Sequence, residues 1–394
     1  MNEIDTKKFK TRTLFIERNN RKIPGIWTIA LDVGYSSTKC FSPNFCGVFP
    51  TYARKKDAGE HMTIGGYSDD YICYKDLETG EEWLVGEAAA NIIEYGDMTD
   101  IRKSVVNRDR YFDPAFKVYL ETGLGLSMRE NAYGDPSGKV VHVQTGLPPE
   151  YMKKDTPYIQ RPLSGRHHFS LKIGNAAPIE FDFTIEPSHV YVMPQPMGTL
   201  LGAAIDNSFH PTADGMNILS SNTIVFDPGF GTLDIFTVKR NEVQQPLTDL
   251  NLGMAEVFCR TIHAIYEKYG IEVSLPSLQN YLAEGEVPYY NRESFESYTV
   301  PFADLLEKAN EEVCMEALKK LNSLFNLVEY KYLIITGGTG AAWNKILRDK
   351  MKGLRTLTIL DGNLNDDLPF LFSNVRGYYI SRCQNFEQLT KKTG

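Results

Sequence analysis

Cysteine is scarce in this 394-residue sequence, and no two cysteines are closely spaced. Zinc sites need ligand pairs such as Cys-x-x-Cys, and disulfide-stabilised folds need a high density of cysteine in a short chain. Neither condition holds for the six cysteines, which are Cys40, Cys46, Cys73, Cys259, Cys314 and Cys383. We therefore expect a reduced, cytoplasmic protein whose cysteines pack as small apolar residues.

Long hydrophobic runs and an excess of basic charge are also missing. No apolar run reaches the roughly 18 residues that a membrane-spanning helix needs. The first 22 residues are too polar for a secretory signal. The chain has 50 acidic against 42 basic residues, a net charge of −8, whereas proteins that bind DNA directly usually carry a basic excess. We expect neither membrane association nor direct binding of nucleic acid.

Two common nucleotide-binding motifs are absent. The P-loop requires Gly-x-x-x-x-Gly-Lys followed by serine or threonine, and the nearest match, Gly134 to Lys139, is one residue short and lacks the hydroxyl. No Gly-x-Gly-x-x-Gly with a following acidic partner occurs, which disfavours a dinucleotide-binding fold. A nucleotide site in this chain would need another kind of phosphate loop.

What is present is the composition of a globular protein, with 42% apolar and 23% charged residues. Apolar strands alternate with amphipathic helices, which predicts an α/β architecture with mixed sheets. We expect strands at residues 27–31, 140–144, 169–173, 179–186, 223–226 and 332–335, and helices at 87–93, 113–120, 197–205, 255–269, 302–325 and from Ala341. Residues 45–74 are expected to form a smaller, more exposed group of short strands.

Residues 1–24 read as a polar N-terminal arm, with at most one hairpin around Asn19 and Asn20. A disordered tail is the favoured interpretation, although the basic residues of the arm could also touch DNA or a neighbouring subunit. These residues are Lys7, Lys8, Lys10 and Arg12.

An internal repeat is the most informative feature. Thr28–Tyr35 (TIALDVGY) matches Thr223–Phe230 (TIVFDPGF), with identical Thr, Ile, Asp and Gly and a final aromatic residue. Repetition at this distance suggests two homologous halves. Each copy is a strand, an aspartate and a glycine turn whose amides can bind phosphate, while the aspartate suits water-coordinated Mg²⁺. A single Asp-x-Gly would be an ordinary turn; two copies and a Gly-rich third segment favour a nucleotide site.

Three segments in this order resemble the actin, Hsp70 and hexokinase superfamily: Asp32–Lys39 its first phosphate loop, Asp227–Asp234 its second, and Ile335–Gly340 its adenosine loop. Within it, the chain is most similar to the bacterial actin-like plasmid-segregation proteins of the ParM/StbA family. The segments that carry this similarity are Val143–Pro148, Val192–Gly198 and Phe372–Tyr378. The resemblance covers residues 26–379 and leaves the N-terminal arm unexplained.

The resemblance implies an actin-like fold of duplicated, ribonuclease H-like halves, with four subdomains around a nucleotide cleft. Domain I would span residues 25–195, with an outer subdomain at about 47–110. Domain II would span residues 196–374, with an outer subdomain at about 270–330. Residues 375–394 would form a C-terminal helix that returns to domain I.

The resemblance also implies roles for individual residues. Asp32 and Asp227 would orient Mg²⁺ and its waters, and Lys39 would reach the β-phosphate unless it is solvated. Gln195 would position the attacking water, since an amide cannot deprotonate it; the alternative is a buried glutamine bonded to backbone beside Pro194. The nucleotide-binding residues would be Gly34, Tyr35, Ser36, Ser37, Gly229, Phe230, Gly231 and Thr232 for phosphate, and Gly337, Gly338, Thr339 and Gly340 for ribose and base.

Two positions in the second loop leave questions open. Pro228 removes an N–H where relatives usually have another residue, which puts the loop geometry in doubt. Asp234 is placed as in the family, with a structural and a ligand role equally favoured.

The function implied is that of an actin-like ATPase, or GTPase, whose slow Mg²⁺-dependent hydrolysis is coupled to filament formation. Its partners would be further copies of itself and a ParR-type adaptor bound to plasmid DNA. A sugar-type small-molecule kinase of the same superfamily is the alternative, although no acceptor-site carboxylate is recognisable outside the two loops. An Hsp70-like chaperone is disfavoured because too few residues follow Gly340 for a peptide-binding domain.

Overall fold

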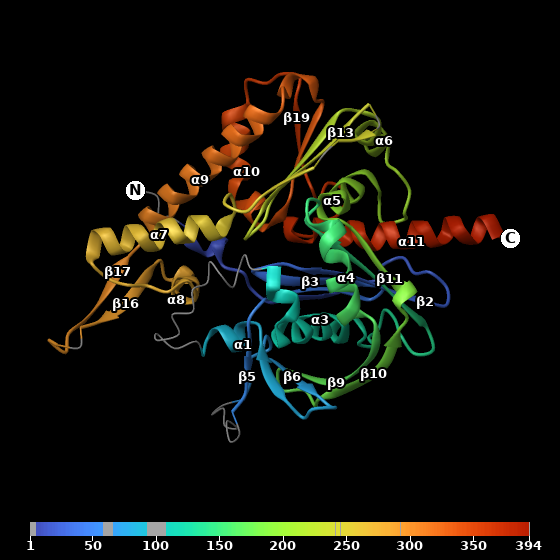
Figure 1. Ribbon diagram of the computed structural model, residues 1–394, viewed down its shortest axis with the longest axis horizontal. Coiled ribbons are helices and arrows are strands. Elements are labelled where there is room, and N and C mark those ends of the chain that lie inside the picture. The colour runs from blue at the N-terminus through green and yellow to red at the C-terminus, as the bar shows by residue number, and fades with distance from the viewer. Residues whose placement is uncertain are drawn as a thin grey trace.

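The computed structural model describes residues 5–57, 66–92, 108–240, 242–244, 246–291 and 293–393. Figure 1 shows two lobes, with the long helix α11 (Ser373–Thr393) running between them. We call the lobe built on strands between residues 14 and 194 the first half, and the lobe built on strands between residues 223 and 361 the second half.

A six-stranded inner sheet forms the centre of the first half. Its order is β1 (Leu14–Glu17), β4 (Phe45–Pro50), β3 (Ser37–Ser42), β2 (Ile26–Val33), β8 (Val140–Leu147) and β11 (Val190–Pro194). Strand β2 is buried along its whole length because both faces of the sheet are covered. Alternate residues such as Trp27 and Leu31 pack toward helix α3 (Pro114–Ser127), while Ile26 and Ala30 pack toward α11.

Helix α3 lies between the inner sheet and a second, outer sheet of the order β10-β9-β6-β7-β5. Asp113 caps its first turn by accepting a hydrogen bond from the amide of Ala115. Two glycines allow the close approach to both sheets: a Cβ on Gly123 would lie 2.8 Å from Leu31, and one on Gly125 would lie 2.6 Å from Leu171. The outer strands are β5 (Ala53–Lys55), β6 (Ile72–Asp76), β7 (Glu82–Val85), β9 (Gly165–Ile173) and β10 (Ile179–Ile185).

The second half repeats the pairing of the first inner sheet. Strand β12 (Thr223–Pro228) is antiparallel to β13 (Leu233–Lys239) and parallel to β18 (Tyr332–Ile335), which is parallel to β19 (Thr358–Asp361). In the first half β2 is likewise antiparallel to β3 and parallel to β8, which is parallel to β11. The predicted α/β fold of duplicated halves is therefore confirmed.

Helices cover both faces of the second sheet. One core contains residues of β12, α7 (Met254–Tyr269), α9 (Ala303–Leu324) and α10 (Gly337–Met351), and the other contains residues of α5 (Gln195–Ala204) and α6 (Ala213–Ser220). Helix α7 ends at Gly270, which has the left-handed φ of 69° expected of a C-terminal glycine. The remaining elements are α1 (Glu87–Ala90), α4 (Met152–Leu163), α8 (Leu275–Asn280), β14 (Glu242–Val243), β15 (Leu247–Asp249), β16 (Glu286–Tyr290) and β17 (Ser297–Pro301).

Several sequence-based boundaries need correction. Residues 45–50 are not part of an exposed subdomain, because β4 is buried in the inner sheet. The outer sheet also recruits residues 165–185, which the predicted range of 47–110 omits. The last helix starts at Ser373. The predicted end of the helix at 87–93 lies outside the described residues. Within those residues, no helix is long and apolar enough to cross a bilayer.

The N-terminal arm is not a disordered tail over its described residues. Residues Thr6–Phe9 form a 3-10 helix, η1, that begins after the capping residue Asp5. Strand β1 then pairs with β4 rather than forming a hairpin around Asn19 and Asn20. The prediction failed because the partners of these residues lie far away along the chain.

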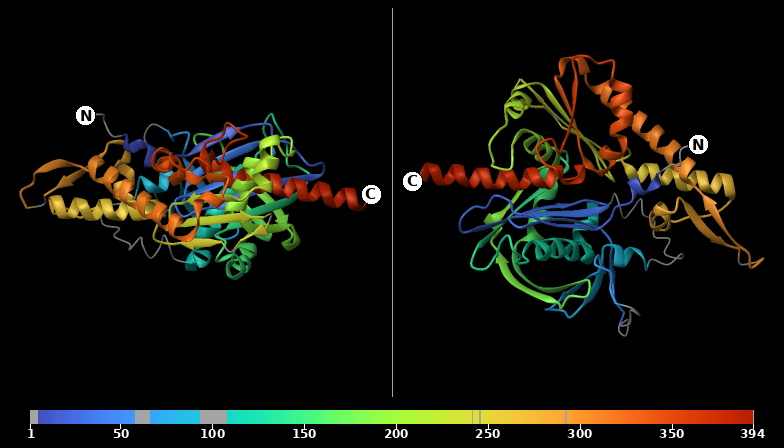
Figure 2. Two further views of the ribbon diagram at one scale, coloured as in Figure 1. Left: turned by 90° about the horizontal axis from the view of Figure 1, so that it is seen from above. Right: turned by 180° about the vertical axis from the view of Figure 1, so that it is seen from behind.

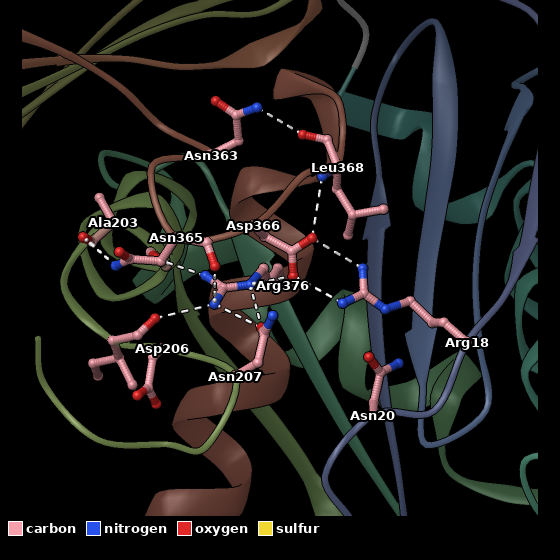
Figure 3. Close-up of polar contacts among 12 residues, drawn as sticks. Arg18, Asn20, Ala203, Asp206, Asn207, Asn363, Asn365, Asp366, Leu368 and Arg376 are labelled. Atoms are coloured by element: carbon pink, nitrogen blue, oxygen red, sulfur yellow. Dashed lines mark hydrogen bonds and ion pairs between the residues drawn. The ribbon is translucent and has the colours of Figure 1, made fainter.

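A buried ionic cluster joins this arm to the second half and to α11 (Figure 3). Arg18 donates two hydrogen bonds to the carboxylate of Asp366, at 3.0 and 2.9 Å, and Arg376 Nε donates a third at 3.1 Å. Burial opposes the charge on Asp366, but Arg18 and Arg376 outweigh it and lower the pKa of this carboxyl. A single carboxylate, that of Asp366, is therefore the hydrogen-bond acceptor and counter-charge for two guanidinium groups.

We expect Asp366→Ala to lower the free energy of unfolding by about 3–5 kcal/mol, because it leaves a buried guanidinium without its counter-charge. Chemical denaturation would measure the loss. The control is Asp182→Ala, which removes an exposed pair with Arg166 and should cost about 1 kcal/mol at most. Equal losses in the two variants would contradict a special role for the buried cluster.

Candidate functional site

The two repeated segments fold into the same hairpin. Strand β2 turns into β3 so that Asp32 lies opposite Lys39, and β12 turns into β13 so that Asp227 lies opposite Asp234. Each turn is closed by its glycine: the Gly34 amide donates to Ser37 O at 3.0 Å, and the Gly229 amide donates to Thr232 O at 2.7 Å. The N–H that Pro228 lacks is not needed for this closure, so the loop geometry is retained.

The two hairpins meet at one cavity of about 610 Å³ between the halves. Tyr35 of the first hairpin packs on the second so closely that a Cβ on Gly231 would lie 2.8 Å from its ring. The cavity brings together every predicted site residue except Gly340, which packs behind it against Ile335. Those lining it are Asp32, Gly34, Tyr35, Ser36, Ser37, Lys39, Gln195, Asp227, Gly229, Phe230, Gly231, Thr232, Gly337, Gly338 and Thr339.

Two side chains contact the carboxylate of Asp32, one from β3 and one from the first residue of α5. Lys39 Nζ lies 3.2 Å from Asp32 Oδ2, and Gln195 Nε2 donates to Asp32 Oδ1 at 2.9 Å. Gln195 is half-buried at the start of α5, and its bond to a carboxylate differs from the backbone bond of the alternative interpretation. Gln195 also lines the cavity.

Two further carboxylates are buried in the second hairpin. Burial raises the pKa of Asp227 to about 6, lowered in part by the hydrogen bond from Asn374 (2.7 Å) and raised by the charge of Asp32. Burial and the charge of Asp227 raise the pKa of Asp234 to about 7. Asp234 accepts hydrogen bonds from the hydroxyls of Thr232 and Thr248, at 3.0 and 2.5 Å. The site thus concentrates negative charge that is incompletely neutralised.

The third predicted segment is the first turn of helix α10 rather than a loop that precedes a helix at Ala341. Gly337 has a φ of +78°, and a Cβ there would lie 2.8 Å from Asp227 Oδ1, so this position requires glycine. Thr339 Oγ1 donates to Gly229 O at 2.8 Å and ties the helix to the second hairpin. The segment therefore places first-turn amides, which have no partner within the helix itself, at the cavity.

Comparison with known proteins agrees with this architecture. Residues 30–198 match the family model of the actin-like protein N-terminal domain. A non-polymerisable quadruple mutant of pCBH ParM superposes with a TM-score of 0.69 at 21% identity, over 91% of this chain and 99% of that one. The chain has the actin-like fold. No curated protein sequence matches it.

Two other solved structures share the fold of this actin-like chain. A 15-stranded ParM filament from Clostridium botulinum gives a TM-score of 0.69 at 20% identity, over 92% of this chain and 100% of that one. The archaeal actin homologue Ta0583 in complex with ADP gives 0.58 at 14% identity, over 91% and 99%. The predicted similarity to ParM-type actin-like proteins is confirmed.

The residues of the actin-like chain fit a Mg²⁺ ion bound mainly through water. Mg²⁺ commonly takes one or two protein carboxylates and completes its shell with water and phosphate. Asp32 and Asp227 supply such carboxylates. Burial, and to a smaller extent the charge of Asp32, raise the pKa of Asp227, and a bound cation would relieve both costs. Within the described ranges, no group of three or more acidic, histidine or cysteine side chains forms a closed metal site.

Sequence reasoning missed several residues that line the cavity. Arg110 stacks over the ring of Tyr35, 4.3 Å from its centre, and donates to Val33 O at 2.9 Å. Its Nε is buried without a hydrogen-bond partner among the described residues. No local pattern could assign Arg110, because its neighbours come from β2 and the first hairpin. The N-terminal arm also lines the cavity, and the only signal was Phe9 within a basic run.

Proposed function

We propose that this chain is a Mg²⁺-dependent ATPase, with GTP as the alternative substrate, that binds its nucleotide in the cavity between the two halves. One observation carries the proposal: two equivalent glycine hairpins, each with an aspartate at its base, line the same cavity. Glycine turns bind phosphate through backbone amides, and paired carboxylates suit hydrated Mg²⁺. The first turn of α10 adds helix-terminal amides on the third side.

In this proposal, phosphate binding and orientation of the attacking water are carried out by different residues of the cavity. The amides of the two hairpins hold the phosphates, and Lys39 and Arg110 add positive charge beside the first hairpin. Bound Mg²⁺ would supply charge that stabilises the phosphate oxygens. Gln195 donates its N–H to Asp32, so its amide oxygen can accept a hydrogen bond from the attacking water and orient it. Water adds to the γ-phosphorus as the bond to the bridging oxygen breaks, releasing nucleoside diphosphate and phosphate.

We further propose that nucleotide binding drives filament formation and that the filament segregates plasmid DNA in the bacterial cytoplasm. Support comes from similar solved structures of a ParM filament and of an Alp12 filament. DNA would be reached through a DNA-bound adaptor of the ParR type, in keeping with the net charge of −8. The rate of hydrolysis would then set the lifetime of the filament.

Adding ATP and Mg²⁺ to the purified chain is expected to raise light scattering and to produce polymer that sediments. Samples with ADP, or with ATP and excess chelator, are the controls and should stay largely in the supernatant. Negative-stain electron microscopy would identify filaments directly. ATP-dependent phosphorylation of a sugar by a chain that never polymerises would instead support the kinase alternative.

A further inference from the structure

The first described residues of the N-terminal arm are anchored in the second half. Phe9 is 7% exposed and belongs to the apolar core that contains residues of α7, α8 and α9. Thr6 Oγ1 donates to Leu282 O at 2.5 Å, and Lys8 forms an ion pair with Glu307 at 3.1 Å. Figure 2 shows the N-terminal segment at the end of the molecule that carries the β16–β17 hairpin.

The following residues of the same arm are anchored in the first half. The amide of Thr13 donates to the carboxylate of Glu87, at the start of α1. Strand β1 then adds to the inner sheet through four residue pairs with β4. Arg18 continues this attachment through Asp366. The arm therefore crosses from one half to the other within a few residues.

The crossing segment lies over the nucleotide cavity. Residues Lys7 to Arg12 line it, together with the two hairpins and the start of α10. Lys10 and Thr11 also border a small pocket shared with Ser36 of the first hairpin. Lys10 Nζ donates to Asn280 O at 3.3 Å. The arm thus forms one wall of the cavity, in addition to the walls formed by the two hairpins and the start of α10.

The outer parts of the two halves also touch beside the arm. Asn280 Nδ2 donates to Ala90 O at 2.9 Å, and the Tyr52 hydroxyl hydrogen-bonds with Gln279. These contacts join α8 of the second half to α1 and to the residue before β5 in the first half. The side of the cavity near Ser36 is therefore closed both by side-chain bridges and by the arm.

We propose that residues 5–13 form a strap that holds the bound nucleotide in the cavity, so that nucleotide exchanges only when η1 detaches from the second half. This proposal rests on the nucleotide site proposed above. The four residues between Phe9 and Leu14 bridge the two anchors, and an extended chain of five residue steps spans at most about 18 Å. Any wider separation of the halves must release one end.

The end that releases first is the one with the weaker attachment. Strand β1 is held by a ladder of backbone hydrogen bonds and by the buried pair of Arg18 with Asp366. Helix η1 is held by one aromatic ring, one hydroxyl and a partly exposed ion pair. Lys7 and Arg12 form no ion pair within the described part of the chain, so their charges are available to an anionic ligand.

The test is the dissociation rate of a fluorescent ADP, N-methylanthraniloyl-ADP with Mg²⁺, chased by excess unlabelled ADP from the full-length chain. Phe9→Ala should raise this rate about tenfold or more, because truncating a buried phenylalanine removes most of the η1 anchor. The matched control is Phe325→Ala, which removes a ring packed on the same core at the end of α9. It should leave the rate within about twofold of wild type while lowering stability.

A charge exchange tests the same anchor without removing apolar contact. Lys8→Glu should raise the dissociation rate about twofold to fivefold, since it places two carboxylates together. The double variant Lys8→Glu with Glu307→Lys should return the rate toward wild type. Amide hydrogen exchange at Lys7–Lys10 should also slow when Mg²⁺ and ADP bind.

The outcomes of these experiments distinguish the proposed strap from the proposed nucleotide site. Failure of the wild-type chain to bind labelled ADP would reject the nucleotide site, and the strap with it. Normal binding with an unchanged rate in folded Phe9→Ala and in Lys8→Glu would reject the strap alone. An equal increase in Phe325→Ala would show general loosening of the second half and would also reject it.

Discussion

Replacing Asp227 by asparagine is expected to lower Mg²⁺-dependent ATP hydrolysis by about a hundredfold or more, because charge at the reacting phosphate is no longer balanced by a correctly held metal. The same variant should be more stable than wild type in the absence of nucleotide and Mg²⁺. Asp227 is buried beside Asp32, which disfavours its charge. An asparagine keeps an oxygen for the hydrogen bond from Asn374 and carries no charge.

The stability gain should depend on pH in a definite direction. The pKa of Asp227 is about 6 in the folded chain against 3.8 for the ordinary group. Well below pH 3.8 both states hold the proton, whereas between pH 3.8 and about 6 the unfolded chain has lost it and the folded chain still holds it. Wild type therefore loses up to about 3 kcal/mol relative to Asp227→Asn as the pH rises to 7.

Melting curves at pH 4.5 and 7, without Mg²⁺, would measure this difference as a gain of a few degrees that grows with pH. Asp182→Asn provides the control, since Asp182 is exposed and its pKa is lowered by Arg166. That variant should keep full hydrolysis and should not gain stability. Normal hydrolysis in Asp227→Asn would remove the metal assignment, and a stability gain that shrinks at pH 7 would contradict the raised pKa of Asp227.

Gln195→Ala should lower the hydrolysis rate by about tenfold to a hundredfold while leaving nucleotide affinity nearly unchanged. The amide would orient water and would make no contact that holds the nucleotide in the ground state. Single-turnover hydrolysis and equilibrium binding of labelled ADP would separate the two effects. Gln244→Ala, at a glutamine outside the cavity lining, is the matched control and should alter neither.

A parallel loss of binding and hydrolysis in Gln195→Ala would have a different meaning. Gln195 donates to Asp32, so its removal could displace that carboxylate and weaken the metal site as a whole. The residue would then be a positioning residue that acts through Asp32. Comparing the Mg²⁺ dependence of the variant with that of wild type would distinguish this case, since a displaced Asp32 raises the Mg²⁺ concentration needed.

The parts of the fold that sequence predicted are those specified by local pattern. Strand β18 was predicted with its observed ends, because a short apolar run stands before a glycine-rich turn. The duplicated hairpins were found because the same residues recur at the same spacing, and the structure brings both to one cavity. Their roles in binding and catalysis remain predictions that the variants above would test.

What sequence could not predict depends on contacts between distant segments. Phe9 reads as one aromatic residue in a basic tail, and only the core of the second half, more than 200 residues away along the chain, accounts for its burial. Arg110 is similar, since its partners belong to β2 and the first hairpin. The start of α10 was misplaced because glycines usually disfavour helix, whereas here Gly337 is needed for close contact with Asp227.

The two chain ends differ in a way that matters for microscopy of living cells. Most of the first described residues, from Asp5 onward, line the cavity, whereas α11 extends to the opposite end of the molecule (Figure 1). A fluorescent protein joined just before Thr6 would be attached next to residues that line the cavity, whereas one fused after α11 would be attached at the far end of the molecule. Reporters for imaging this protein should therefore be attached through a linker at the C-terminus.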